Sequence, residues 1–396
     1  MGARAIAADS RDFSVVLGGP LFQLFRKAHL SGAGLELVGQ RLLVMIALCW
    51  LRLLVLSVAR GLALGSSVAV PFLYDIEAQA RILLFVPLLV GAELVVHQRL
   101  RSVVDQFLQR DLIPDDARPR FEAAVASATR LRNSVVAEVT MVGVVYALGL
   151  AVLWRNTSLD VATWYATPDG GEKTLSPAGF WYVYFTLPLT QFLLLRWYYR
   201  LFIWTRFLWQ VSRIQLRLVP THPDRIGGLG FLSSATAAFS TLALAHGAFV
   251  SAWIAARIFM QGATLLDFKF VIIAVAVWML LLFLGPFLLF SVQLAQAKRQ
   301  AEREYGPLAQ RYAREFDTKW VRGGAPRDEP LLGSADIQSL ADLGNVYTVV
   351  HTMRATPITR QAVVQLLGAT LAPIAPLALT MMPIGEVAKL LFGILV

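Results

Sequence analysis

Charged residues are scarce in this sequence. Of its 396 residues, 57% are hydrophobic and only 16% are charged, whereas an average soluble domain has about a quarter charged residues. This composition excludes a soluble globular enzyme. Cysteine is nearly absent too: the single Cys49 excludes an internal disulfide framework and a metal site built from several cysteines. Because Cys49 lies within an apolar run, we interpret it as a small buried hydrophobic residue.

Familiar catalytic patterns are also missing. The sequence has no His-Glu-x-x-His motif, no Gly-x-Ser-x-Gly motif and no aspartate-rich diphosphate-binding box. We therefore predict neither a metal nor a cofactor, and an enzyme is not the favoured interpretation. The net charge of +10 does not indicate nucleic-acid binding, because in so apolar a chain the positions of the basic residues matter more than their sum.

Long apolar runs are what the sequence has in abundance. A helix crosses a bilayer core of about 30 Å with about 20 residues, and the period-2 alternation of a membrane barrel is absent. The predicted class is therefore an all-α, polytopic transmembrane helical bundle of six or seven spans with a cytoplasmic helical layer. The candidate spans are residues 42–58, 82–97, 134–153, 179–195, 229–256, 270–293 and 361–382.

Basic residues fall mainly in every second connection between these spans. Segments 1–41, 98–133, 196–228 and 294–360 hold 28 of the 36 Lys and Arg residues, and the alternate connections hold seven. Because cytoplasmic loops carry the excess of Lys and Arg, we expect a cytoplasmic N-terminus and, with an odd number of spans, a C-terminus outside.

Three regions follow from this division. Residues 1–293 form the bundle of six spans and include cytoplasmic helices at 98–133, and residues 294–360 form a cytoplasmic helical segment. In the latter, Ser334 is expected to cap a helix that stops at Gly344. The apolar stripes of these helices need a partner, either each other or another subunit of a homo-oligomer. Residues 361–396 are read as a last span followed by an interfacial helix, with a broken re-entrant pair as the alternative.

Five arginines follow the fourth span. On a helical projection they cover one broad face, which favours contact with the anionic lipid headgroups of the bilayer. They are Arg196, Arg200, Arg206, Arg213 and Arg217.

The densest group of prolines and glycines is at residues 220–231, which we call the proline–glycine turn. Its side chains His222, Asp224 and Arg225 offer a base, an anion and a cation. Its glycines permit close backbone approach, and the N–H groups of the next helix can hold an anion. The alternative is a rigid turn in which Asp224 caps the backbone or pairs with Arg225. The glycines concerned are Gly227, Gly228 and Gly230.

Ionisable residues within the spans are the second candidate site. Arg52, Glu93 and Glu138 are costly in lipid, and such residues often line a pathway for ions or solutes. We expect Glu93 and Glu138 at similar depth near the inner face. The alternative is a structural ion pair, for instance between Glu138 and Arg52.

A third group of polar residues surrounds Pro188 in the fourth span. These residues either line the same pathway or make ordinary hydrogen bonds between helices. They are Thr186, Thr190 and Gln191.

Two stretches resemble an uncharacterised family of bacterial multi-pass inner-membrane proteins. They are His222-Pro-Asp with Gly227-Gly-Leu-Gly-Phe231, and the run from Leu331 to Asn345. The resemblance implies a bacterial inner membrane and no particular activity.

Three functions are therefore open. The favoured one is a channel or transporter for ions or small solutes, with a path that runs past the intramembrane acids. The second is a membrane sensor or scaffold whose cytoplasmic helices bind a partner. The third is a membrane-embedded enzyme that uses His222 and Asp224 at the boundary between lipid and water.

Overall fold

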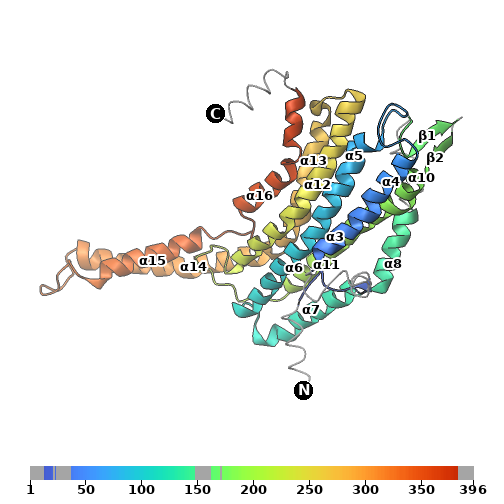
Figure 1. The fold of residues 1–396 in the computed structure, drawn as a ribbon. Coiled ribbons are helices and arrows are strands. Elements are labelled where there is room, and N and C mark those ends of the chain that lie inside the picture. The colour runs from blue at the N-terminus through green and yellow to red at the C-terminus, as the bar shows by residue number, and fades with distance from the viewer. Residues whose placement is uncertain (1–12, 21–22, 24–36, 148–161, 170–171, 382–396) are drawn as a thin grey trace.

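The computed structural model describes residues 13–20, 23, 37–147, 162–169 and 172–381. They form a bundle of long helices with one small β-hairpin (Figure 1). The hairpin pairs β1 (Ala166–Asp169) with β2 (Glu172–Leu175) in antiparallel register, with Ala166 opposite Leu175.

Five helices are long and apolar enough to cross a membrane: Val38–Ala59, Ile76–Gln109, Pro177–Val211, Leu229–Gln261 and Leu265–Val321. The first comprises α3 (Val38–Ile46), a π-helical turn η1 (Ala47–Leu51) and α4 (Arg52–Ala59). The second comprises α5 (Ile76–Ala80), η3 (Arg81–Phe85) and α6 (Val86–Gln109). The third comprises α10 (Pro177–Trp181), η6 (Tyr182–Thr186) and α11 (Leu187–Val211). The last two contain α12 (Leu232–Gln261), and α13 (Lys269–Leu284) with α14 (Ser291–Phe316).

Five of the predicted spans coincide with these five helices, and the other two need separate accounts. In the span predicted at 134–153, the described residues form the shorter apolar helix Val135–Ala147, which includes α8 (Val135–Val144), and residues 148–153 lie outside the described residues. At 361–382, α16 (Arg360–Leu371) and η11 (Ala375–Met381) form a pair bent by 53°. The described part of the chain thus has five candidate membrane spans, or six if the bent pair is one span. The interfacial helix predicted after it lies outside the described residues.

Proline explains where two of the spans change their helical pitch. The π-helical turns η3 and η6 end just before Pro87 and Pro188. A proline inside a helix lacks an N–H and its ring clashes with the carbonyl four residues earlier, so the helix must adjust there. At Pro188 that carbonyl belongs to Tyr184, and it accepts a hydrogen bond of 3.1 Å from the Tyr146 hydroxyl on the neighbouring span.

The centre of the bundle is α12, which packs against α6 and α16. Small side chains allow this contact: a Cβ on Gly247 would lie 2.1 Å from the Thr370 carbonyl oxygen. The Ser251 hydroxyl next to it donates a 2.6 Å hydrogen bond to the Pro373 carbonyl. The lone Cys49 is buried and free, as its apolar surroundings predicted.

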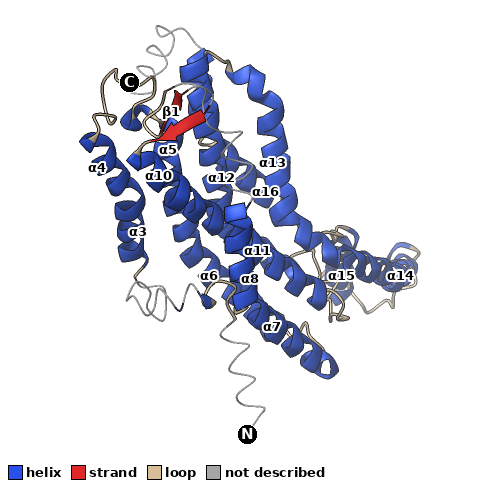
Figure 2. Cartoon of the chain, turned by 90° about the vertical axis from the view of Figure 1, so that its right-hand side faces the viewer, coloured by secondary structure: helices blue, strands red, loops and turns tan. Residues whose placement is uncertain are grey.

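Three of the basic connections meet at one end of the bundle, which we call the basic end. Here α7 (Arg118–Arg132) follows α6, and the Arg217 N–H donates to the Leu112 carbonyl. The Arg354 N–H donates to the Arg225 carbonyl in the same region. The β-hairpin lies at the opposite end (Figure 2). Segments 98–133, 196–228 and 294–360 therefore share an end, and which side of the membrane this end faces stays a prediction.

A helical hairpin projects away from the basic end (Figure 1). It consists of α14 and α15 (Ala335–His351), which pack on each other, although Leu308 of α14 and Ile337 of α15 remain exposed. The expected stop at Gly344 is wrong. Ser334 does cap the helix, by accepting from the Asp336 N–H at 3.1 Å, but α15 continues through Gly344 to His351. A glycine costs an exposed helix only about 1 kcal/mol, which is too little to end it.

Labelling from one side of the membrane tests this arrangement. In a Cys49→Ala background, we expect an impermeant thiol reagent to label Thr174→Cys, exposed on β2, in intact cells. Asp328→Cys, exposed at the tip of the α14–α15 hairpin, should be labelled only after lysis. The reverse pattern would invert the orientation, and labelling of both from one side would contradict the fold.

Candidate functional site

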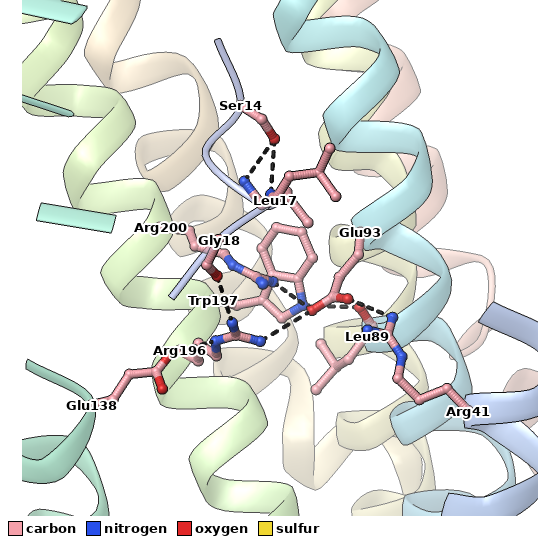
Figure 3. Close-up of polar contacts among 11 residues, drawn as sticks. Ser14, Leu17, Gly18, Arg41, Leu89, Glu93, Glu138, Arg196, Trp197 and Arg200 are labelled. Atoms are coloured by element: carbon pink, nitrogen blue, oxygen red, sulfur yellow. Dashed lines mark hydrogen bonds and ion pairs between the residues drawn. The ribbon is translucent and has the colours of Figure 1, made fainter. Parts of the chain in front are cut away.

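Glu93 lies at the centre of a buried cluster of charges, shown in Figure 3. Its side chain on α6 is 6% exposed and contacts three arginines. Arg41 of α3 contacts Oε2 at 2.5 Å. Arg200 and Arg196 of α11 contact Oε1 at 2.8 Å and 3.5 Å. One carboxylate thus joins three spans, and we call these residues with Glu138 the arginine–glutamate cluster.

Glu138 joins the cluster through Arg196. Its Oε1 atom, on α8, lies 3.4 Å from Arg196 Nε. Arg196 Nη2 also donates to the Gly18 carbonyl oxygen, at 3.4 Å. Because Arg196 contacts both carboxylates, Glu93 and Glu138 belong to one site.

The cluster lies toward the basic end of the spans. Glu93 is 17 residues beyond Ile76 and Arg196 is 19 residues beyond Pro177, which is about 26 Å and about 29 Å along each helix at about 1.5 Å per residue. Arg41 is only three residues into its own span. Along the second and third helices, the charges therefore lie one hydrocarbon-core thickness, about 30 Å, from the end opposite the basic end.

An indole ring fixes α11 against α6 beside these charges. Trp197 Nε1 donates to the Leu89 carbonyl at 2.9 Å, and the Arg200 guanidinium lies 4.8 Å from the centre of the Trp197 ring. A cation over an aromatic face is attracted to it. The ring therefore orients Arg200 toward Glu93.

Residues 13–20, which we call the inserted segment, enter the bundle next to the cluster (Figure 3). Phe13 is 2% exposed and lies 5.0 Å, centre to centre, from the Phe207 ring. The Ser14 hydroxyl lies 2.8 Å from His97 Nδ1, and the Ser14 carbonyl accepts from Arg132 Nη1 at 2.7 Å. The segment is thus part of the core rather than a surface strand.

Glycine is required where the inserted segment passes the cluster. Gly19 has a φ of +91°, and a Cβ there would lie 2.8 Å from Glu138 Oε1. Its N–H donates to Asn133 Oδ1 at 3.1 Å. A side chain at Gly19 would therefore strain the backbone and push on the Glu138 carboxylate.

Not every predicted pathway residue reaches the cluster. The suggested pair between Glu138 and Arg52 is wrong, because Arg52 is exposed and its guanidinium lies 3.7 Å from the centre of the Trp181 ring. Arg196 is the arginine that contacts Glu138.

The polar residues around Pro188 lie before Arg196 in the chain, at the end of η6 and in the first turns of α11. Thr186 is fully buried and ten residues before Arg196, about 15 Å along the helix. The Thr190 hydroxyl donates to the Leu187 carbonyl at 2.9 Å within its own helix. Gln191 is half-buried. Among the described residues, none of these three side chains hydrogen-bonds to Glu93, Arg196 or Arg200.

The proline–glycine turn is closed by Asp224 itself. Asp224 Oδ1 accepts from the N–H groups of Ile226 (2.8 Å) and Gly228 (3.2 Å), and Oδ2 accepts from Gly230 at 2.8 Å. His222 Nδ1 lies 3.0 Å from the same carboxylate. These N–H donors, which an external anion would need, are thus taken by the protein's own carboxylate.

The turn also anchors the α14–α15 hairpin. Arg225 has a positive φ of 56°, and its carbonyl accepts from the Arg354 N–H at 2.8 Å rather than its guanidinium pairing with Asp224. A Cβ on Gly227, whose φ is +63°, would lie 3.2 Å from Met353 Cε. Gly228 has a φ of +94° and its carbonyl accepts from Arg110 at 3.2 Å. The glycines therefore serve backbone conformation and close packing.

Sequence reasoning missed three of the arginine–glutamate cluster's residues. It assigned Arg196 and Arg200 to lipid headgroups, but both are 5% exposed and face the bundle interior, so that interpretation is wrong for them. It left Arg41 just outside the first predicted span. The available signal was spacing: Arg196 and Arg200 are one turn apart, so they share a face. Arg213 and Arg217 further along are exposed.

Comparisons with family models, curated proteins and solved structures find no match to this chain. The resemblance to an uncharacterised bacterial family stays a prediction. Among the described residues, no group of three or more His, Cys, Asp or Glu side chains is placed to hold a metal ion.

The arginine–glutamate cluster predicts a large cost for removing Glu93. Glu93→Gln should destabilise the protein by about 3–5 kcal/mol, because it leaves buried guanidinium groups without their carboxylate. The double variant Glu93→Gln, Arg200→Gln should lose less free energy of unfolding than the two single variants lose in sum. Denaturant unfolding in micelles measures this, with the exposed Glu315→Gln as control. Equal stability of Glu93→Gln and Glu315→Gln would refute the pairing.

Asp224 predicts an acid-dependent component of stability. Burial by itself would raise the pKa of Asp224, but the hydrogen bonds from Ile226, Gly230 and Gly228 and the nearby His222 outweigh it and hold the pKa below the ordinary 3.8. A depressed carboxyl pKa stabilises the fold above the ordinary value, and this is lost as the pH falls through the folded-state pKa. Asp224→Asn should cost about 1–3 kcal/mol at neutral pH. The difference in free energy of unfolding between Asp224→Asn and wild type should shrink below about pH 4. A difference that does not depend on pH would contradict the stabilising role of the ionised Asp224.

Proposed function

We propose that this chain is an integral membrane protein that acts as a channel or transporter for ions or small solutes, and that the path passes the arginine–glutamate cluster. The observation that supports the proposal is the Glu93 carboxylate held by three guanidinium groups among apolar helices. Ionisable residues at membrane depth face the bundle interior and mark pathways for ions, solutes or protons.

Stability alone is a weak reason for such a cluster. Replacing a buried group of ion pairs by apolar side chains of similar volume is often neutral or stabilising. Five buried charged side chains, Arg41, Glu93, Glu138, Arg196 and Arg200, are therefore an expensive way to hold α3, α6, α8 and α11 together. A path that needs a polar lining accounts for them better.

The inserted segment supports a gated path. Its backbone lies against Arg196 through the Gly18 carbonyl and against Asn133 through the Gly19 N–H. A solute that approaches the cluster from the basic end meets this segment. The conformation described is accordingly the closed one in our proposal, and conduction requires the segment to move.

A second candidate function is a membrane sensor or scaffold, favoured by the projecting α14–α15 hairpin. Exposed apolar residues lie at its tip, including Leu332 at 87% and Val321 at 66% exposure. Lys319 contacts Glu329 at 2.6 Å and Asp336 at 2.8 Å, which fixes the tip. The membrane-enzyme interpretation is less favoured, because Asp224 is engaged within its own turn.

Flux in liposomes tests the proposed function. Ion-loaded liposomes that contain the purified protein should release the ions faster than ion-loaded liposomes without protein. Glu138→Gln should alter the rate or the selectivity of this release, while the exposed Glu315→Gln should behave like wild type. Gly19→Val should raise the flux, because its side chain displaces the inserted segment. Gly65→Val is the matched control, because its φ of +95° is also positive and a Cβ there meets nothing within 4 Å. Absence of flux from wild type and Gly19→Val alike would refute the proposal and favour the scaffold.

A further inference from the structure

We propose that the solute is a small monovalent anion, a halide or a short-chain carboxylate, which binds Arg196 and Arg200 in place of the Glu93 carboxylate. This inference rests on the proposed function, since it names the class of solute that the same site takes. It follows from how the two arginines of α11 are satisfied.

Arg196 is a buried cation with only long contacts. Its guanidinium lies 3.4 Å from Glu138, 3.4 Å from the Gly18 carbonyl and 3.5 Å from Glu93, and among the described residues it has no shorter polar contact. Charge-assisted N–H···O⁻ hydrogen bonds are about 2.7–2.9 Å long. A guanidinium that is 5% exposed and has five N–H donors would gain from an acceptor that comes closer.

Arg200 makes the second half of the site. It lies one turn after Arg196 on α11, and both contact the same oxygen, Glu93 Oε1. Two guanidinium groups therefore share one acceptor atom. A single anion between them, either a halide or the carboxylate of a small acid, can accept hydrogen bonds from both guanidinium groups.

Glu93 can give up this position without being stranded. Its other oxygen, Oε2, is held by Arg41 on a different helix at 2.5 Å. If Oε1 leaves α11, the carboxylate keeps its pair with Arg41 while the incoming anion takes the donors of Arg196 and Arg200. The three arginines and two glutamates of the cluster carry a net charge of +1, which the incoming anion neutralises, and no covalent bond changes.

The size and sign of the solute follow from the same geometry. The space that an anion would enter is the one that Glu93 Oε1 leaves beside Arg196 and Arg200, so the solute must be small. A cation would approach a cluster of three guanidinium groups and two carboxylates, whose net charge is +1, and repulsion between like charges is strong in a poorly solvated site. The site therefore discriminates by sign first and by size second.

Flux of both signs in one preparation tests the inference. Liposomes are loaded with chloride or acetate as the anion, and with potassium or sodium as the cation. We expect the anions to exchange and the cations to be retained, and Arg196→Gln to lower anion flux by about tenfold or more. Arg213→Gln, which removes an exposed arginine of the same region, should leave the rate unchanged. Cation flux without anion flux would overturn this inference and leave the proposed function intact.

Chemical rescue gives a readout that does not need transport. Glu93→Ala removes the carboxylate, and its melting temperature should fall. Sodium formate, acetate or chloride should restore it in proportion to concentration, and the salt that restores it best distinguishes a carboxylate site from a halide site. The same salts should raise the melting temperature of the double variant Glu93→Ala, Arg200→Gln only weakly. Failure of every anion to rescue Glu93→Ala, with wild type folded in the same salts, would overturn the anion site even if flux is seen.

The two measurements separate the two proposals. Rescue without any flux would refute the transport function while retaining an anion site on Arg196 and Arg200. Flux of anions together with rescue supports both. If Glu93→Ala does not fold, the more conservative Glu93→Gln is tested instead, and anion binding must then raise its melting temperature above that of the same variant in sulfate.

Discussion

A carboxylate and several guanidinium groups can remain buried among apolar helices only if they satisfy one another. This constraint governs the arrangement of the bundle. Glu93 on α6 binds Arg41 on α3 and Arg200 on α11, and Arg196 extends the contact to Glu138 on α8. The spans are therefore held together by charge as well as by apolar packing. Breaking one pair costs more than the pair contributes, because the partner that stays behind is stranded in a poorly solvated place.

The same constraint explains why the inserted segment lies where it does. Arg196 takes one of its contacts from the Gly18 backbone carbonyl, and the neighbouring Gly19 lies close to Glu138 with a φ of +91°, which favours glycine. The contacts of Arg196 and the position of the inserted segment thus depend on the same few residues. In our proposal, displacement of this segment removes the Gly18 carbonyl from Arg196 and exposes the site, and an entering anion replaces that acceptor.

The fold was more predictable from the sequence than the site was. Apolar runs indicate spans directly, because a bilayer demands about 20 apolar residues whatever the tertiary structure, and the glycine and proline content of residues 220–231 indicated a turn. Which face of a helix points inward depends on its neighbours, so Arg196 and Arg200 read as headgroup contacts although they face Glu93. Arg41 and Glu93 are 52 residues apart in sequence, and no local pattern connects them. The role of residues 13–20 has no local signal either, because their burial depends on the cavity that distant helices provide.

An experimentally determined structure of the wild-type protein in bromide would show whether Arg196 and Arg200 bind an anion, since bromide is a small monovalent anion that scatters strongly. We expect bromide density within hydrogen-bonding distance of Arg196 and Arg200, with the Glu93 carboxylate turned toward Arg41. The anion site would be contradicted if the Glu93 carboxylate still contacted Arg200 at full occupancy and no bromide lay beside Arg196, at bromide concentrations at which the protein transports the ion.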